Sequence, residues 1–185
     1  MKKLTEFEVQ NALFSKLFQS NHHITPNYTP RGWWECDMFA VTKAGYFVEY
    51  EIKCTASDFR NDKNKERECW RDWESGKVTK DGAKHKKHDL IQSGYHKGPS
   101  KFYFVLPDGE VATDEVPQWA GVMRASRFEE RVCIGLERKA PTLHRQMVHE
   151  SVIHHVQSLF YYRFWNERRK DRGNGVTFKQ LEEEA

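Results

Sequence analysis

The chain of 185 residues is long enough for one domain with a hydrophobic core. Its mean hydropathy is -0.86 and 31% of its residues are charged, but 14% are aromatic, which argues against a disordered chain. No apolar run approaches the roughly 18 residues of a membrane span, and no apolar signal core follows the N-terminal segment. We therefore expect a folded protein without a membrane segment.

The net charge of +3 is too small to identify a partner, but basic residues gather locally. Between Lys53 and Lys101, Lys and Arg outnumber Asp and Glu, which is the electrostatic pattern that polyanion binding needs. The alternative is a solvated charged face. The cysteines form no CxxC pair, so we expect reduced thiols in a cytoplasmic protein rather than a metal cluster. They are Cys36, Cys54, Cys69 and Cys133.

The N-terminal half of the chain predicts a helix followed by a β-hairpin. The predicted elements are a helix over 5–19, an irregular segment over 20–32 with a short strand near 23–26, and strands over 33–42 and 46–54. Thr5 and Glu8 fit a capping box at the start of the helix. The connection Lys43-Ala44-Gly45 has hairpin length, so we expect the two longer strands to pair antiparallel.

The C-terminal half alternates helices and strands. The predicted elements are a helix capped by Ser57 or Asp58 and running toward Trp73, a helix over 84–93, strands over 101–106, 121–126 and 131–137, and a long helix over about 142–169. This order favours an α/β fold with a mixed central sheet flanked by helices. We predict a single domain over 1–170, with a charged insertion at about 62–84, and a flexible tail over 171–185.

The second strand of the hairpin carries an unusual row of charges. Side chains alternate across a strand, so Glu49, Glu51 and Lys53 lie on one face, while apolar residues lie on the other. An exposed salt bridge is the simpler interpretation of such a row. The preceding strand, however, carries Asp37 in an apolar setting, where a carboxylate needs a partner.

Pairing of the two strands brings Asp37 next to Glu51. Two converging carboxylates repel each other, and a divalent cation relieves that repulsion. Oxygen ligands suit Mg²⁺ or Mn²⁺ rather than zinc. Such a site can polarise a phosphate and generate hydroxide from bound water, and Lys53 can orient the water or offset charge on the phosphate.

An Asp on the first strand of a hairpin, followed by Glu51-Ile52-Lys53 on the second, resembles the PD-(D/E)XK nuclease superfamily. The resemblance covers roughly residues 5–145. The chain resembles in particular the small DNA-repair-type nucleases related to MmcB, which occur in bacteria and phages. The segments that carry it are Tyr50-Glu51-Ile52-Lys53, Ser57-Asp58-Phe59-Arg60-Asn61-Asp62, Lys87-His88-Asp89, Lys101 to Pro107 and Val116 to Val122.

The resemblance implies a restriction-endonuclease-like core and Mg²⁺- or Mn²⁺-dependent hydrolysis of DNA. Asp37 and Glu51 would hold the metal with the backbone carbonyl of Ile52, and Lys53 would position or activate the water. The N-terminal helix often supplies another acid, for which Glu8 is the first candidate and Glu6 the second. Glu49 is a further candidate acid, because it is in phase with Glu51 and Lys53.

The nucleic-acid contacts are predicted in three segments. The resemblance places the helix predicted over 84–93 near the active site, so Lys84, Lys87 and His88 are candidate contacts to nucleic acid. The alternative is a solvated helix end. Arg60 lies in the matching Ser-Asp-Phe segment. Trp70, in the charged insertion, could stack a base, or it could pack on the body of the domain.

Two other functions stay open beside a deoxyribonuclease. One is a protein of the same fold that binds nucleic acid or a host factor without cleaving. The other is an RNA-directed nuclease. A small nuclease that cuts both strands would often need two copies, so a homodimer is also an expectation.

Overall fold

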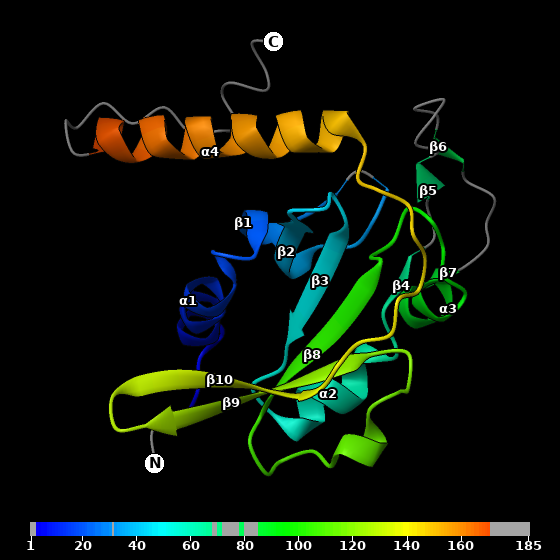
Figure 1. Ribbon diagram of the computed structural model, residues 1–185, viewed down its shortest axis with the longest axis vertical. Helices are drawn as coiled ribbons and strands as arrows, with labels where there is room; N and C mark the ends of the chain where they lie inside the picture. Colours follow the sequence, from blue (N-terminus) through cyan, green and yellow to red (C-terminus); the bar gives the residue numbers. More distant parts are fainter. Residues whose placement is uncertain (1–2, 31, 68–69, 72–77, 80–84, 171–185) are drawn as a thin grey trace. The chain divides into compact units, whose positions relative to one another are not determined.

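The computed structural model describes residues 3–30, 32–67, 70–71, 78–79 and 85–170 (Figure 1). The chain divides into two compact units, residues 1–148 and 149–185. The division falls at Val148, whereas the sequence led us to expect one domain over 1–170. The predicted flexible tail over 171–185 lies outside the described residues.

In the described part of the chain, a six-stranded mixed sheet forms the centre of the first unit. Its strands, in spatial order, are β1 (Asn21–Tyr28), β2 (Cys36–Thr42), β3 (Phe47–Ile52), β8 (Lys101–Pro107), β9 (Gly121–Phe128) and β10 (Arg131–Arg138). β8 pairs in parallel with β3 and β9, and the other neighbours are antiparallel. The predicted α/β fold with a mixed central sheet is therefore confirmed.

β2 and β3 form the predicted antiparallel hairpin. Its turn is closed by a hydrogen bond from the Gly45 amide to the Thr42 carbonyl, at 2.9 Å. Gly45 has a φ of +80°, which explains why glycine occupies this turn. The register places Met38 opposite Tyr50 and Phe39 opposite Glu49, so Asp37 belongs to the face of the sheet that carries Glu49.

One face of the sheet is covered by α1 (Glu6–Leu17). The predicted capping box is present, since the Thr5 hydroxyl accepts a hydrogen bond from the Glu8 amide and the Glu8 carboxylate accepts one from the Thr5 amide. The apolar side of α1 packs on alternate residues of β3 in the hydrophobic core. That part of the core consists of Val9, Leu13, Leu17, Val48, Tyr50 and Ile52.

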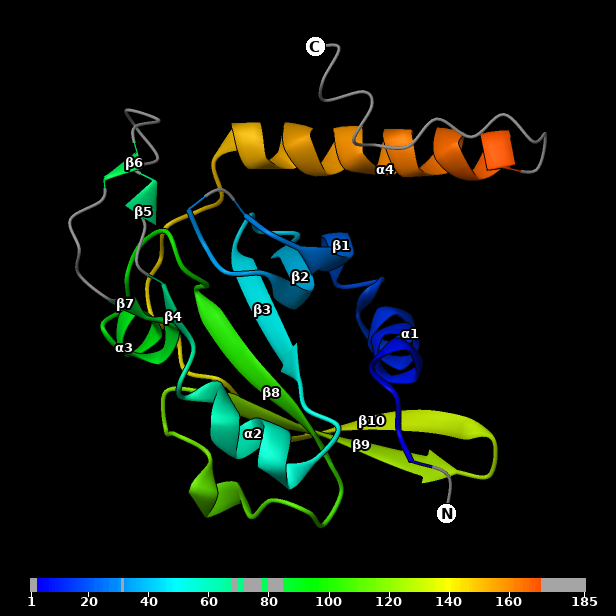
Figure 2. The same cartoon turned by 180° about the vertical axis from the view of Figure 1, so that it is seen from behind.

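The opposite face carries α2 (Ala56–Asp62) and α3 (Lys87–Gln92). Figures 1 and 2 show β3 and β8 running between α1 and these two helices. The ring of Phe104 on β8 contacts the rings of Phe59 on α2 and His88 on α3, with centroids 5.1 and 5.9 Å away. Because residue 104 lies opposite Glu51 in the parallel ladder, both helices cover the face that bears the charged row.

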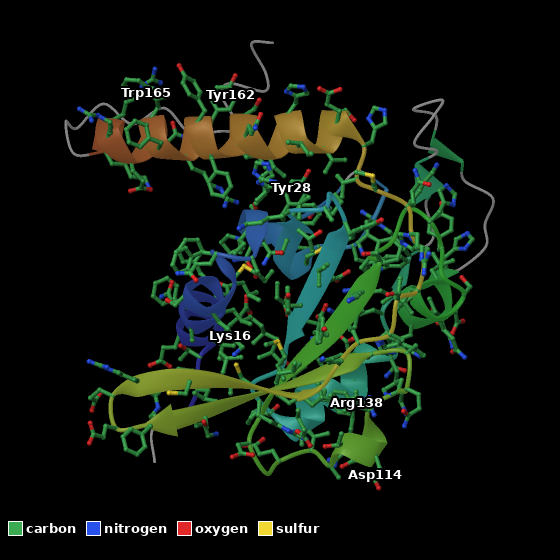
Figure 3. The ribbon with its side chains drawn as sticks, viewed as in Figure 1. Lys16, Tyr28, Asp114, Arg138, Tyr162 and Trp165 are labelled. Atoms are coloured by element: carbon green, nitrogen blue, oxygen red, sulfur yellow. The ribbon has the colours of Figure 1, made fainter. Side chains whose placement is uncertain are left out.

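The connection from β8 to β9 contains the short 3-10 helix η1 (Thr113–Glu115). Arg138, at the end of β10, holds this connection in place (Figure 3). Its guanidinium donates hydrogen bonds to the carbonyls of Thr113, Val116, Pro117 and Ala120. The connection in turn positions the Trp119 ring against His88, with centroids 5.1 Å apart.

The helix predicted to run toward Trp73 is much shorter. Thr55, rather than Ser57 or Asp58, provides the N-cap, because its hydroxyl accepts a hydrogen bond from the Asp58 amide. The helix ends at Asp62. Two short antiparallel strand pairs follow, so the backbone groups of these strands form hydrogen bonds between strands instead of within a helix. The pairs are β4 (Glu66–Arg67) with β7 (His85–Lys86), and β5 (Trp70–Arg71) with β6 (Val78–Thr79).

The last helix of the described chain, α4 (Glu150–Lys170), confirms the predicted long C-terminal helix but begins later than residue 142. The preceding segment bonds to the sheet unit instead of forming helical turns. The amides of Leu143 and Val148 donate to the carbonyls of Ser100 and Gly45, at 2.9 and 2.8 Å. Among the described residues, no helix combines the length and apolar character needed to cross a membrane.

Candidate active site

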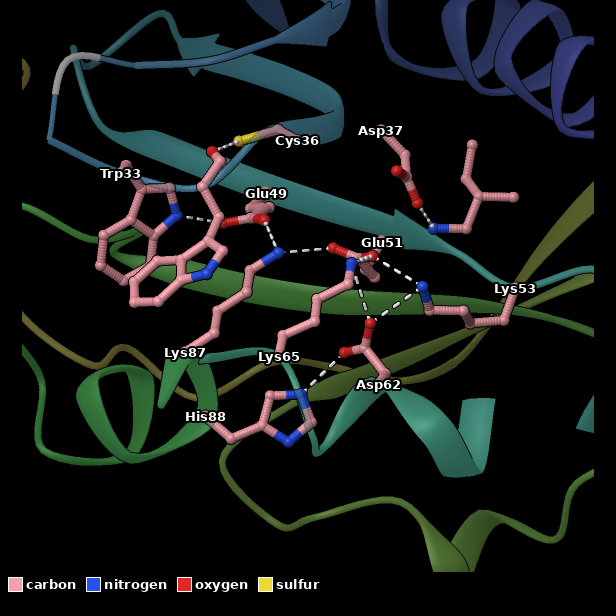
Figure 4. A network of polar contacts seen from close by, with 12 residues as sticks. Trp33, Cys36, Asp37, Glu49, Glu51, Lys53, Asp62, Lys65, Lys87 and His88 are labelled. Carbon is pink, nitrogen blue, oxygen red and sulfur yellow. Dashed lines mark hydrogen bonds and ion pairs between the residues drawn. The ribbon is translucent and has the colours of Figure 1, made fainter. Parts of the chain in front are cut away.

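The charged row on β3 lies in the interior of the protein (Figure 4). Glu49 and Glu51 are 0% exposed and Lys53 is 6% exposed. An exposed salt bridge is therefore the wrong interpretation of this row. Burial of three ionisable side chains is costly unless each finds a charged partner, so the partners decide what this site can do.

Asp37 reaches the end of β3 through its side chain. Its Oδ2 accepts a hydrogen bond from the Ile52 amide at 2.7 Å. Burial and the negative charge of Glu51 raise the pKa of Asp37 to about 7, although Lys53 acts in the opposite direction. The hairpin thus brings Asp37 and Glu51 close enough to repel each other, as expected from the sequence.

Glu51 is the centre of the cluster. Its Oε1 accepts from Lys53 Nζ at 2.7 Å and from Lys65 Nζ, and its Oε2 accepts from Lys87 Nζ at 2.6 Å. Burial favours the neutral acid, but Lys87 and the other lysines outweigh it and lower the pKa of Glu51. Glu51 is therefore an ionised carboxylate at neutral pH.

Lys87 bridges two acids of β3 from the start of α3. Its Nζ lies 2.6 Å from Glu49 Oε1 and from Glu51 Oε2, and its side chain is 0% exposed. The indole nitrogen of Trp33 donates to the other oxygen of Glu49 at 2.8 Å. Burial raises the pKa of Glu49 despite the Lys87 charge. Lys87, expected as a nucleic-acid contact, instead lies in the interior and neutralises the two glutamates.

Asp62 and Lys65 belong to the cluster, although the sequence did not suggest a role for either. Asp62 Oδ1 lies 2.9 Å from Lys53 Nζ and 3.0 Å from Lys65 Nζ. Its Oδ2 lies 2.7 Å from Nε2 of His88. Burial opposes ionisation, but His88 and Lys53 prevail and lower the pKa of Asp62. No periodicity in the sequence relates Asp62 or Lys65 to β3, so neither could be assigned to the cluster before its fold was known.

The acid predicted from α1 is placed differently from expectation. Glu8 Oε2 pairs with Arg127 of β9 at 2.8 Å, and Arg127 with Thr5 lowers the pKa of Glu8 to about 2. The hydrogen bonds that link α1 to the hairpin come from Gln10 instead. Its Nε2 donates to Glu6 Oε1 at 2.9 Å and to the Asp37 carbonyl at 3.0 Å. Glu6, the second candidate, is therefore the acid that α1 links to Asp37.

The other predicted nucleic-acid contacts are scattered. Arg60 lies at the surface of α2, and its guanidinium pairs with Glu115 at 3.0 Å. His88 is 16% exposed at its side chain and belongs to the Asp62 pair. Trp70 contributes backbone to β5, but its side chain lies outside the description, as does all of Lys84.

The oxygen donors suit a hard divalent cation. Asp37, Glu51 and the Ile52 carbonyl offer the ligands that Mg²⁺ or Mn²⁺ prefers. Burial and the charge of Glu51 raise the pKa of Asp37, and a cation held between the two acids would offset their repulsion. In the described chain, no three His, Cys, Asp or Glu side chains form a ready metal-binding group. The donors therefore fit the ion in chemistry, and a lysine must leave Glu51 for it to bind.

No family model and no curated protein matches the chain. A solved structure, the SPO1766 protein of unknown function from Silicibacter pomeroyi, has a similar fold with a TM-score of 0.60. The two sequences are 13% identical, and the match covers 95% of this chain and 99% of that chain. The likeness shows a shared fold and nothing about activity.

Proposed function

We propose that this protein is a Mg²⁺- or Mn²⁺-dependent nuclease that hydrolyses phosphodiester bonds of DNA. The observation that carries the proposal is the meeting of Asp37, Glu51 and Lys53 at the end of the β2–β3 hairpin. The Asp37 carboxylate is bonded to the Ile52 amide, and its pKa is raised to about 7 by burial and by Glu51. Perturbed acids that converge beside a cation are typical of catalytic sites.

Each residue has a separate role in the proposed reaction. Asp37, Glu51 and the Ile52 carbonyl would hold the metal, which would polarise the phosphate and acidify its bound water. Burial disfavours the charged form of Lys53, but Glu51 and Asp62 more than compensate and raise its pKa above the ordinary value. Lys53 therefore stays an ammonium ion, so it orients water and offsets phosphate charge rather than removing a proton.

The surroundings of these residues support a polyanionic substrate. Three lysines, Lys53, Lys65 and Lys87, converge on one carboxylate, that of Glu51. The same lysines also pair with Glu49 and Asp62, so the cluster holds its ammonium groups beside several acids. An incoming phosphodiester would draw on these ammonium groups, of which that of Lys65, at 37% exposed, is the most accessible.

A protein that binds nucleic acid without cutting is the second candidate. One observation favours it: both oxygens of Glu51 are already engaged by lysines, so the charge of Glu51 is compensated without a metal. Such a protein would keep its salt-sensitive binding of nucleic acid in a Lys53→Ala variant. An RNA-directed nuclease would use the same residues and differ only in its substrate.

The test is cleavage of labelled single-stranded, duplex and branched DNA, and of matching RNA, with Mg²⁺ or Mn²⁺. We expect metal-dependent cleavage of DNA by the wild type, and loss of cleavage in Asp37→Asn and Lys53→Ala. Asp108→Asn is a matched control, because this exposed carboxylate lies in the turn after β8. Absence of cleavage with every substrate and both metals would favour the binding protein.

Two further assignments belong to this proposal. A cytoplasmic location is supported by Cys36, Cys54 and Cys133, which are free thiols in the described chain. A homodimer is proposed for cleavage of both strands of a duplex, and the sedimentation of the protein with and without duplex DNA tests it.

A further inference from the structure

Lys65 and Lys53 share the same pair of carboxylate oxygens. Lys53 Nζ lies 2.7 Å from Glu51 Oε1 and 2.9 Å from Asp62 Oδ1. Lys65 Nζ binds the same Glu51 oxygen and lies 3.0 Å from the same Asp62 oxygen. Two ammonium groups on one pair of oxygens repel each other, so either would gain from another anion nearby.

The two lysines differ in their access to a ligand. The side chain of Lys65 is 37% exposed, whereas that of Lys53 is 6% exposed. Lys87, the third lysine on Glu51, is 0% exposed. Lys65 is therefore the ammonium group of the cluster that can turn toward a molecule arriving from solvent.

The backbone of Lys65 is fixed although its head group is accessible. Its amide donates to the Asp62 carbonyl at 3.1 Å, and its carbonyl accepts from the Lys87 amide at 3.1 Å. The four-carbon stem thus swings from a rigid base, which lies between the end of α2 and the β4–β7 pair. A short rotation of the stem exchanges one anion for another without movement of the main chain.

The charges of the cluster indicate that Lys65 would exchange its carboxylate partners for another anion when a metal ion binds. The ammonium groups of Lys53, Lys65 and Lys87 pair with the carboxylates of Glu49, Glu51 and Asp62, and the Asp37 carboxylate, bonded to the Ile52 amide, is the fourth acid of the cluster (Figure 4). A divalent cation at Asp37 and Glu51 would leave one positive charge in excess. It would also compete with the lysines for the Glu51 carboxylate, and Lys65 is the most exposed of them. One phosphodiester carries the single negative charge that balances this excess.

Resting on the proposed function, we propose that Lys65 is a second substrate-binding lysine. Its ammonium group leaves Glu51 and Asp62 when metal and nucleic acid bind, and it donates to a non-bridging oxygen of the backbone phosphate at the site. Lys53 remains between Glu51 and Asp62. The charged insertion predicted at about 62–84, which includes Lys65, therefore contributes a contact to the reacting part of the substrate.

The experiment compares Lys65→Gln and Lys65→Arg with the wild type. Lys63→Gln is the matched control, because it removes the same charge from an exposed lysine two residues away. Binding of a labelled DNA oligonucleotide is measured with Ca²⁺ in place of Mg²⁺ from low to high salt. Cleavage with Mg²⁺ gives kcat and KM for each variant.

We expect Lys65→Gln to weaken binding about tenfold, the loss of one charge-assisted hydrogen bond. The slope of log K against log salt should fall by about 0.7–0.9, which corresponds to one phosphate contact. KM should rise more than kcat falls. Lys65→Arg should restore most of the slope, and Lys63→Gln should resemble the wild type.

An unchanged salt slope and KM in Lys65→Gln, with a wild type that cleaves, would overturn the role of Lys65 and leave the nuclease proposal standing. Loss of the fold in Lys65→Gln would also overturn it, because Lys65 would then be a structural cation. A wild type that cleaves nothing but shows the Lys65-dependent slope would reject the nuclease and retain the phosphate contact.

Discussion

Lys87 Nζ and Glu51 Oε2 lie 2.6 Å apart, and neither side chain is exposed to solvent. The pair joins the first turn of α3 to the C-terminal end of β3. Because Lys87 also binds Glu49, one buried ammonium group compensates two buried carboxylates. Among the described residues, removal of that single charge therefore leaves buried Glu49 facing only the Trp33 indole, and leaves one oxygen of Glu51 without its lysine.

We expect Lys87→Met to lower the free energy of unfolding by about 3–5 kcal/mol, the usual cost of breaking a buried ion pair from one side. Urea unfolding at neutral pH measures it. Lys86→Met is the control, since that exposed neighbour pairs only loosely with Glu66, at 3.9 Å, and its effect should stay within about 0.5 kcal/mol. A Lys87→Met variant as stable as the control would contradict the account of the cluster.

Asp37 should make stability depend on pH. Its pKa is about 7 in the folded protein, against an ordinary value of 3.8. A carboxyl whose pKa is raised by folding stabilises the protein below its unfolded pKa, and this contribution is lost as the pH rises through about 7. Between pH 4.5 and 7.5 we expect wild type to lose roughly 1–3 kcal/mol relative to Asp37→Asn.

Urea unfolding of both proteins across this pH range gives that difference. Asp108→Asn, which changes an exposed carboxylate, should follow the wild type. Parallel stability curves for wild type and Asp37→Asn would show that Asp37 is not perturbed by Glu51.

Divalent metal should stabilise the wild type and not the Asp37→Asn variant. An ion that binds only the folded state raises its stability in proportion to the logarithm of its concentration over Kd. At about 100 times Kd the gain is about 2.7 kcal/mol, seen as a rise in Tm with Mg²⁺ or Mn²⁺ and reversed by a chelator. Equal rises in Tm for both proteins would place the ion elsewhere.

His88→Ala should destabilise the protein by about 1–3 kcal/mol, because Asp62 Oδ2 loses its hydrogen-bond partner inside the protein. It also removes the contacts of the ring with Phe104 and Trp119. His22→Ala, at an exposed position of β1, is the control. Thermal unfolding compares them, and similar Tm values would mean that Asp62 does not depend on His88.

The part of the site built from neighbouring strands could be predicted from sequence. Alternation along β3 placed Glu49, Glu51 and Lys53 on one face, and the turn at Gly45 brought Asp37 beside them. Both signals are local, since strand periodicity and turn chemistry act over a few residues. The same locality explains why the capping box of α1 was correct.

The remaining partners depend on contacts between distant segments. Lys87 meets Glu51 across 36 positions, and no periodicity relates α3 to β3. Asp62 and Lys65 reach the cluster because α2 ends at Asp62. The charged composition had instead predicted that this helix continues toward Trp73. Glu8 lies in the first turn of α1, as predicted. Its carboxylate, however, pairs with Arg127 of β9, which is 119 positions away in the sequence.

The segment before α4 has a consequence for how the chain can be cut. Its amides at Leu143 and Val148 are bonded to Ser100 and Gly45, so it is fastened to the sheet at both ends. Limited proteolysis should therefore spare residues 143–148. A chain shortened to Val148 should keep its fold, whereas one shortened to Pro141 would lose both fastenings and uncover the Gly45 turn, against which Met147 packs.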